Sequence, residues 1–139
     1  MKRNLCVLVV ACLFMGGSSA LSDDAEADLK MLQGAWRVVR AESEGKDVKG
    51  QLGYEEVVIE GNSSLVRDEG EVRKSRFQVD PAKTPKQITF ITPKGDEVLG
   101  IYELNGDTWK ILVAKVGAGR PKSFKDAGLF FEHQRAKPK

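Results

Sequence analysis

Cysteine and histidine are scarce in this chain. Its 139 residues include two cysteines, Cys6 and Cys12, and a single histidine, His133. A zinc site needs several nitrogen or sulfur ligands, so the sequence predicts no metal centre. It also has no phosphate-binding glycine loop, no dinucleotide fingerprint and no nucleophile-elbow motif. We therefore expect no catalytic residue, no cofactor and no enzymatic activity.

Long apolar runs are absent after the first 20 residues. Two basic residues precede an apolar stretch at residues 5–15, and small residues lead up to Ala20. This order is typical of a secretory signal peptide, and the stretch is too short to span a membrane. We predict that residues 1–20 are a signal peptide and that residues 21–139 form one domain, exported to the periplasm or the extracellular space.

A second processing site lies within the same segment. Residues 9–12, Val-Val-Ala-Cys, resemble a bacterial lipobox, in which cleavage would precede Cys12 and leave a lipid anchor on it. The apolar stretch continues past Cys12, which favours ordinary secretion. Cleavage after Ala20 would remove both cysteines, so the exported domain would have no disulfide and would depend on its hydrophobic core.

Neither sign of charge is in excess. The chain has 22 basic and 20 acidic residues, and two of the basic residues belong to the predicted signal peptide. The rest of the chain is therefore formally neutral. A nucleic-acid-binding surface would need a surplus of lysine and arginine. We expect no nucleic-acid partner and, from the hydropathy, no integral membrane span.

The sequence does contain a regular series of strand patterns. Residues 22–32 predict a short helix with Ser22 as its N-cap and Gly34 beyond its end. Residues 47–53 fit either a loop or a single helical turn. Alternating apolar and polar residues between turn residues predict eight strands, at 35–42, 54–60, 63–67, 71–79, 86–92, 97–104, 107–115 and 128–135. In the fourth of these, Arg73 and Ser75 share a face with Phe77 and Val79.

The connections between the strands indicate how they pair. Most are short turns, including Asn105-Gly106, a strong hairpin signal, and no second helical segment occurs. Such connections favour an antiparallel meander, and eight strands can close without free edges. The predicted fold class is all-β, a single antiparallel barrel of about eight strands with a short N-terminal helix. Because the strands are short, we expect side chains to fill most of the interior.

Residues 32–36, Leu-Gln-Gly-Ala-Trp, resemble the opening motif, Leu-Gln-Gly-Thr-Trp, of a lipocalin-like domain family expanded in Planctomycetes. Residues 99–108 and 120–124 resemble later motifs of that family, in the same order. The resemblance implies a calycin-type barrel, usually after a signal peptide or attached to other domains. It implies no activity, because the family is chiefly one of unknown function. Asn105 stands where the family more often has aspartate, and residues 111–113 lack a cysteine common there.

The resemblance also implies how one end of the barrel closes. Gly34 and Trp36 look like the start of the first lipocalin strand, where a tryptophan plugs the barrel base beside a basic side chain of the closing strand. Arg135 is the matching basic residue. We therefore expect Gly34, Trp36 and Arg135 to be structural, with a cation–π contact between the last two.

Candidate ligand-binding residues come from the inward faces of the strands and from one loop. Phe90, Tyr102 and Trp109 belong to the apolar set predicted to face the interior. Arg120 lies in a glycine-rich loop, where it would either bind an anion at the barrel mouth or pair with a carboxylate and fix the loop.

Three functions are compatible with these observations. The first is a secreted, non-enzymatic, lipocalin-like module that binds a small apolar or anionic ligand or a protein partner. The second is a structural or assembly protein of the cell envelope with a filled barrel. The third is a hydrolase or isomerase with a site at the barrel mouth, since a fold alone does not exclude it. A ligand-sized cavity would favour the first function, and a filled core with an exposed apolar patch the second.

Overall fold

The computed structural model describes residues 23–68 and 70–136. The predicted signal peptide, a lipid anchor at Cys12 and the N-cap Ser22 lie outside the described residues. The elements in chain order are α2 (Asp23–Leu32), β1 (Gly34–Ser43), β2 (Lys46–Asp47), the short 3-10 helix η1 (Lys49–Gln51), β3 (Glu56–Glu60), β4 (Ser63–Asp68), β5 (Glu71–Asp80), β6 (Lys86–Ile91), β7 (Glu97–Asn105), β8 (Thr108–Val113) and β9 (Leu129–Arg135).

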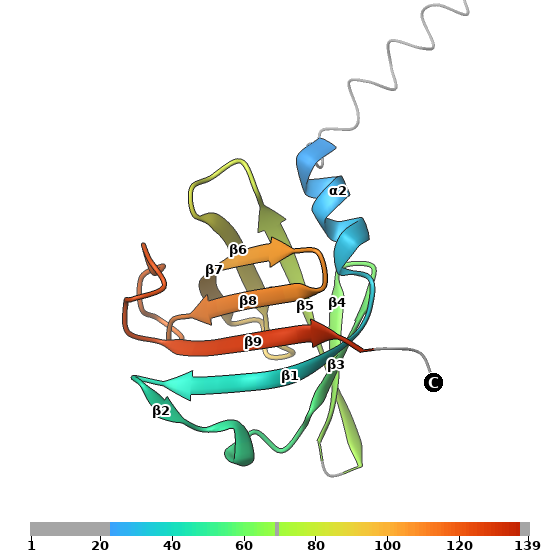
Figure 1. Ribbon diagram of the computed structural model, residues 1–139, viewed down its shortest axis with the longest axis vertical. Coiled ribbons are helices and arrows are strands. Elements are labelled where there is room, and N and C mark those ends of the chain that lie inside the picture. The colour runs from blue at the N-terminus through green and yellow to red at the C-terminus, as the bar shows by residue number, and fades with distance from the viewer. Residues whose placement is uncertain (1–22, 69, 137–139) are drawn as a thin grey trace, which may run out of the picture.

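Eight of these strands form a closed antiparallel barrel. From β3 to β9 each strand pairs with the next one in the chain, and β1 pairs with both β3 and β9. Figure 1 shows the last strand, β9, lying beside β1. The predicted all-β barrel with a short N-terminal helix is confirmed. The sequence did not predict β2, a two-residue strand that pairs only with the end of β1.

β1 closes the barrel because it changes partners along its length. Residues 34–37 pair with β3, whereas residues 36–43 pair with β9. The register against β9 shifts between Val38 and Arg40, where the strand bulges. A bulge bends a strand and increases its twist, which helps a strand curve around a small barrel.

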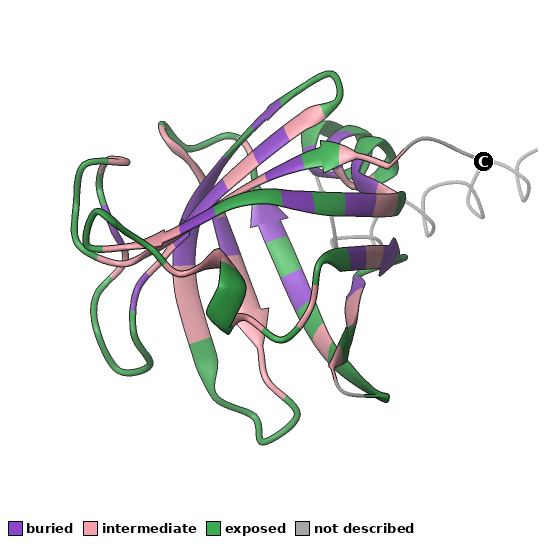
Figure 2. Ribbon diagram, turned by 60° about the horizontal axis from the view of Figure 1, so that its bottom comes forward, coloured by how far each residue is buried: buried purple, intermediate pink, exposed green. Residues whose placement is uncertain are grey.

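Alternating burial along the strands places the apolar side chains inside. Figure 2 shows buried and exposed positions alternating along several strands. In β1, for example, Trp36 and Val38 are buried on either side of the exposed Arg37. The buried inward-facing residues form one cluster, and its strand members are Trp36, Val38, Ala41, Val57, Ile59, Phe77, Val79, Ile88, Tyr102, Leu104, Trp109 and Ile111.

The helix α2 lies at one end of the barrel, as Figure 1 shows, and contributes two side chains to this cluster. Its Ala25 and Leu32 are buried, and so is Asp28. The Tyr102 hydroxyl donates to Asp28 Oδ2 at 2.7 Å, and Lys86 Nζ donates to the same oxygen at 3.1 Å. Burial, and then the Asp28 carboxylate, raise the pKa of Tyr102 above its ordinary value. Tyr102 therefore stays protonated and donates, which fixes the helix to β6 and β7.

Candidate functional site

Trp36 plugs the end of the barrel beneath α2. Its ring is fully buried, and its indole Nε1 donates to the Leu32 carbonyl oxygen at 2.8 Å. The Arg135 guanidinium lies over this ring, with Cζ 4.3 Å from the ring centroid. This is the cation–π contact that the resemblance led us to expect. Gly34 has a φ of +112°, which favours glycine, and a Cβ there would lie 3.5 Å from the Arg135 guanidinium.

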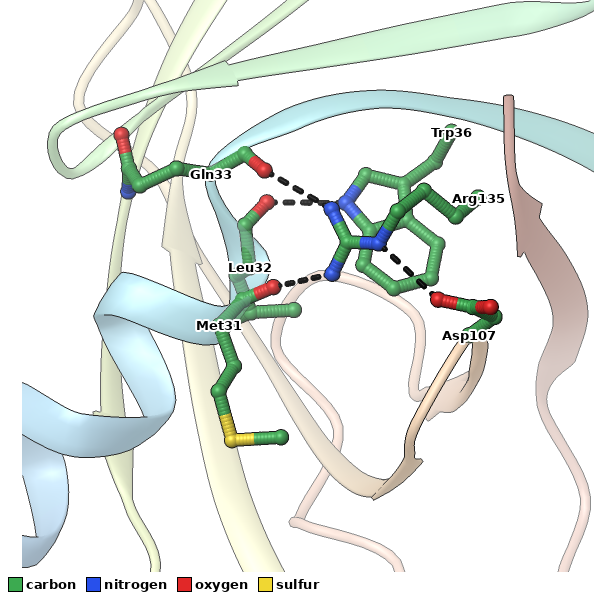
Figure 3. A network of polar contacts seen from close by, with 6 residues as sticks. All are labelled: Met31, Leu32, Gln33, Trp36, Asp107 and Arg135. Carbon is green, nitrogen blue, oxygen red and sulfur yellow. Dashed lines mark hydrogen bonds and ion pairs between the residues drawn. The ribbon is translucent and has the colours of Figure 1, made fainter. Parts of the chain in front are cut away.

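Arg135 also joins the end of α2 to the β7–β8 turn, as Figure 3 shows. It donates to the backbone carbonyl oxygens of Met31 and Gln33, and its Nε lies 3.2 Å from Asp107 Oδ1. The Met31 carbonyl belongs to the last turn of α2, where a cation is favourable because of the helix dipole. These contacts make this end of the barrel a structural closure.

The other end of the barrel contains a cavity of about 520 Å³. Its mouth lies beside the β6–β7 turn, which contributes Pro93, Lys94 and Asp96 to the lining. Most of the lining is apolar: Val57, Val66, Phe90, Pro93, Val98, Trp109, Ile111, Val113, Leu129 and Phe131. The expectation that side chains fill most of the interior is therefore wrong at this end. The physical reason is that β4 and β5 contribute the small residues Ser64 and Ser75 here.

Trp109 and His133 form the floor of the cavity, above Trp36. The Trp109 ring packs against Trp36 with centroids 5.5 Å apart, and His133 stacks on Trp109 at 4.8 Å. Both Trp109 and His133 are buried and line the cavity. The three rings therefore separate the cavity from the packed end of the barrel.

His133 is neutral at this floor. Burial lowers the pKa of His133 from 6.5 to about 4, although the hydrogen bond to the Trp109 carbonyl opposes this effect. Nδ1 lies 3.1 Å from that carbonyl oxygen. A carbonyl oxygen only accepts, so we assign the proton to Nδ1, which leaves Nε2 as an acceptor. No side chain hydrogen-bonds to His133 in the described part of the chain.

The Trp109 indole Nε1 is buried without a hydrogen-bond partner among the described residues. An unpaired buried donor of this kind costs about 1–3 kcal/mol. The neighbouring Trp36 has its Nε1 paired with a backbone carbonyl. Of these two tryptophans, only Trp109, at the cavity floor, has an indole N–H without a partner among the described residues.

One wall of the cavity is polar. Ser64 of β4 lies directly opposite Ser75 of β5, and both line the cavity. Arg73 lies two residues before Ser75 on the same face of β5 and also lines the cavity, opposite Val66. We call Ser64, Ser75 and Arg73 the polar stripe. Apolar residues of β6 to β9 make up most of the remaining wall.

Asp68 and Tyr54 surround Arg73 at the end of this stripe. Arg73 Nη2 lies 2.8 Å from Asp68 Oδ2, and the side chains are 54% and 22% exposed. Burial raises the pKa of the Tyr54 hydroxyl, while the positive charge of Arg73 lowers it and the negative charge of Asp68 raises it. A Cβ on Gly53 would lie 2.5 Å from Asp68 Oδ1, so the segment before β3 packs tightly against this carboxylate.

The structure divides the four expected ligand-binding residues. Phe90 and Trp109 line the cavity. Tyr102 lies at the packed end, bonded to Asp28, and is not part of the cavity lining. Arg120 also does not line the cavity.

Arg120 instead fastens the β8–β9 connection to the outside of the barrel. Its guanidinium donates to the carbonyl oxygens of Ile88 and Gly100 at 2.8 Å each, and to Thr89 Oγ1 at 2.9 Å. Arg120 therefore fixes the loop, which is one of the two expectations from the sequence. Its partners are two carbonyls and a hydroxyl, and no carboxylate is among these contacts.

Ser64, Ser75, Tyr54 and His133 are lining residues that the sequence did not single out for binding. A signal for part of this set was present, because strand alternation placed Arg73 and Ser75 on the same face as the core residue Phe77. Polar residues on an inward face mark a stretch of barrel wall that does not belong to a filled core.

The described residues offer no obvious place for a metal. No group of three or more histidine, cysteine, aspartate or glutamate side chains among them is arranged to hold an ion. The helical segments of the described ranges also lack the length and apolar character that crossing a membrane requires.

No protein-family model, curated protein or solved structure matches this chain. The resemblance of residues 32–36 to a lipocalin-like family therefore stays a prediction. The barrel and its cavity are established by the structure, and a function has to be argued from the residues that line the cavity.

Proposed function

We propose that this protein is an exported binding protein for a small, largely apolar molecule, which occupies the open end of the barrel. The observation that carries the proposal is the cavity of about 520 Å³ with a mostly apolar wall. Ligand sites in proteins have volumes of roughly 300–1,000 Å³ and combine apolar walls with a few polar groups. Both properties are present here, and the packed end of the barrel gives the site a rigid base.

The expected affinity is moderate. Drug-sized ligands gain about 0.3 kcal/mol per non-hydrogen atom. A ligand with roughly 20–25 such atoms would therefore bind with a Kd in the micromolar range. Such affinity suits a carrier or a sensor that must also release its ligand.

The exposed apolar residues favour a cavity function over an assembly function. Four large apolar side chains among the described residues are well exposed, and they lie on α2, β1, β5 and the β8–β9 connection. They are Met31, Val39, Val72 and Val116. An assembly surface is usually a contiguous apolar patch, which this distribution over four separate elements does not suggest.

A cavity-blocking substitution tests the proposal. The probe is N-phenyl-1-naphthylamine, an uncharged dye that fluoresces in apolar surroundings. Val98 is half-buried and lines the cavity, so Val98→Phe should fill part of it and weaken dye binding about tenfold or more, because the dye would then overfill the space that remains. Val72→Phe is the matched control, because Val72 is exposed and does not line the cavity. Absence of dye binding by the wild type, or equal weakening in both variants, would contradict the proposal.

Native mass spectrometry of protein purified from its own host tests the same proposal without a chosen probe. A reproducible extra mass that denaturing extraction releases as a small molecule would support the proposal and identify the ligand. The same spectrum reports the N-terminus. A chain that begins at residue 21 would support secretion, and a diacylglyceryl mass on Cys12 would support a lipoprotein.

A further inference from the structure

The polar stripe on β4 and β5 points to the chemical class of the ligand. We propose that the ligand is an amphipathic anion, with one negatively charged oxygen group on Arg73, Ser75 and Ser64 and an apolar part against the opposite wall. This inference rests on the proposed function and assigns an orientation to the bound molecule. The charged group would lie toward the mouth, and the apolar part toward Trp109.

The serine hydroxyls are available for such a group. Ser64 and Ser75 form a cross-strand pair, so their Cβ atoms lie about 4.5–5.5 Å apart on the same face. Both line the cavity, and neither hydroxyl has a hydrogen-bond partner among the described residues. Two hydroxyl donors at this spacing can both contact one oxyacid group.

Arg73 supplies the positive charge. It lines the cavity on the same face of β5 as Ser75. A guanidinium has five N–H donors, and the only ion pair that Arg73 makes among the described residues uses Nη2, toward Asp68. The remaining donors match the two oxygens of a carboxylate or the several oxygens of a sulfonate or phosphate.

The other charged side chains at the mouth do not form a comparable site for an anion. Lys94 and Asp96 both line the cavity from the β6–β7 turn and carry opposite charges. Asp68 is the acidic side chain that contacts Arg73. An incoming anion therefore competes with Asp68 for Arg73, and Asp68 sets how tightly the anion binds.

Two matched dyes separate the charge from the apolar contact. N-phenyl-1-naphthylamine and 8-anilino-1-naphthalenesulfonate share their ring system, but only the second carries a sulfonate. We expect Arg73→Gln to weaken sulfonate dye binding about tenfold, since charge-assisted hydrogen bonds are the strong ones, and to change neutral dye binding less than about twofold. Arg76→Gln is the control, because Arg76 lies on β5, is exposed and does not line the cavity.

Two further variants keep Arg73 and test the same contact. Asp68→Asn removes the competing carboxylate, so it should strengthen binding of the sulfonate dye several-fold and leave the neutral dye unchanged. A residue with only a structural role would not produce this gain. The double substitution S64A/S75A should weaken the sulfonate dye several-fold and affect the neutral dye little.

The outcomes distinguish this inference from the proposed function. If neither dye binds the wild type, both proposals fail. If the neutral dye binds and Val98→Phe blocks it, while Arg73→Gln and Asp68→Asn leave the sulfonate dye unchanged, the cavity function stands and the anionic ligand is refuted. In the expected case, decanoate displaces the neutral dye at lower concentration than decanol does, and Arg73→Gln removes that difference.

Discussion

Trp36 and Trp109 are both buried in the barrel, but only Trp36 has a partner for its indole N–H among the described residues. The two rings touch, and their relative exposures are 0% and 1%. Replacing each by phenylalanine removes a similar apolar area from the same region. The difference between the two variants therefore reports on the polar contacts of the indoles.

The expected difference follows from these contacts. Trp36→Phe removes the hydrogen bond to the Leu32 carbonyl, worth about 1 kcal/mol, and weakens the cation–π contact with Arg135, worth about 0.5–2 kcal/mol. Trp109→Phe removes an unpaired buried donor and so relieves a cost of about 1–3 kcal/mol. We expect Trp36→Phe to be the more destabilising change by roughly 2–6 kcal/mol, the sum of these contributions.

Urea unfolding of the ligand-free protein at pH 7 measures this difference. Transition midpoints should be compared at equal slope, since a changed slope would mean that the denatured or native ensemble has changed. Equal destabilisation by the two variants, or a larger effect of Trp109→Phe, would refute the reasoning. Either result would mean that the Trp109 N–H is paired in solution.

Two further predictions concern pH and the outer loop. Because the folded-state pKa of His133, about 4, is below its ordinary 6.5, the unfolded chain binds a proton more readily, so His133 should cost the fold about 3 kcal/mol in total as pH falls from 6.5 to 4. Over that window the wild type should lose about 3 kcal/mol more stability than His133→Phe, and parallel stability curves would contradict the assignment. Arg120→Ala should destabilise the fold by about 1.5–3 kcal/mol, since it leaves the Ile88 and Gly100 carbonyls without this donor, yet leave binding of both dyes unchanged in titrations. A loss of sulfonate dye binding alone would show that Arg120 contacts the ligand.

Strand positions were predictable because they depend on local pattern. The predicted strand at residues 71–79 is β5 at Glu71–Asp80, where two-residue alternation is bounded by turn residues. The hairpin predicted at Asn105-Gly106 joins β7 to β8. Short connections between consecutive strands then favoured an antiparallel meander as the simplest arrangement. The structure has this meander, and pairing of β1 with β9 closes it into a ring.

Tyr102 and Arg120 show why the site was harder to predict. Alternation correctly places Tyr102 inside the barrel. Its position at the packed end, however, is held by a hydrogen bond to Asp28, which lies 74 residues away in the sequence. The position of Arg120 depends on carbonyls of β6 and β7, which no side-chain pattern reveals. Both positions are set by long-range contacts, and sequence periodicity carries no information about these.

Whether the barrel interior is filled depends on two things. One is which face of its strand a residue occupies, and the other is how far along the barrel axis it lies. At the packed end, the inward positions hold tryptophan, tyrosine and branched residues that meet across the barrel. On β4 and β5 toward the mouth, the inward positions hold Ser64 opposite Ser75 and Val66 opposite Arg73. Serine side chains cannot fill the space between strands, and a charged guanidinium does not belong in an apolar core. A row of polar residues on an inward face is therefore the part of this sequence that favours a binding cavity over a filled barrel.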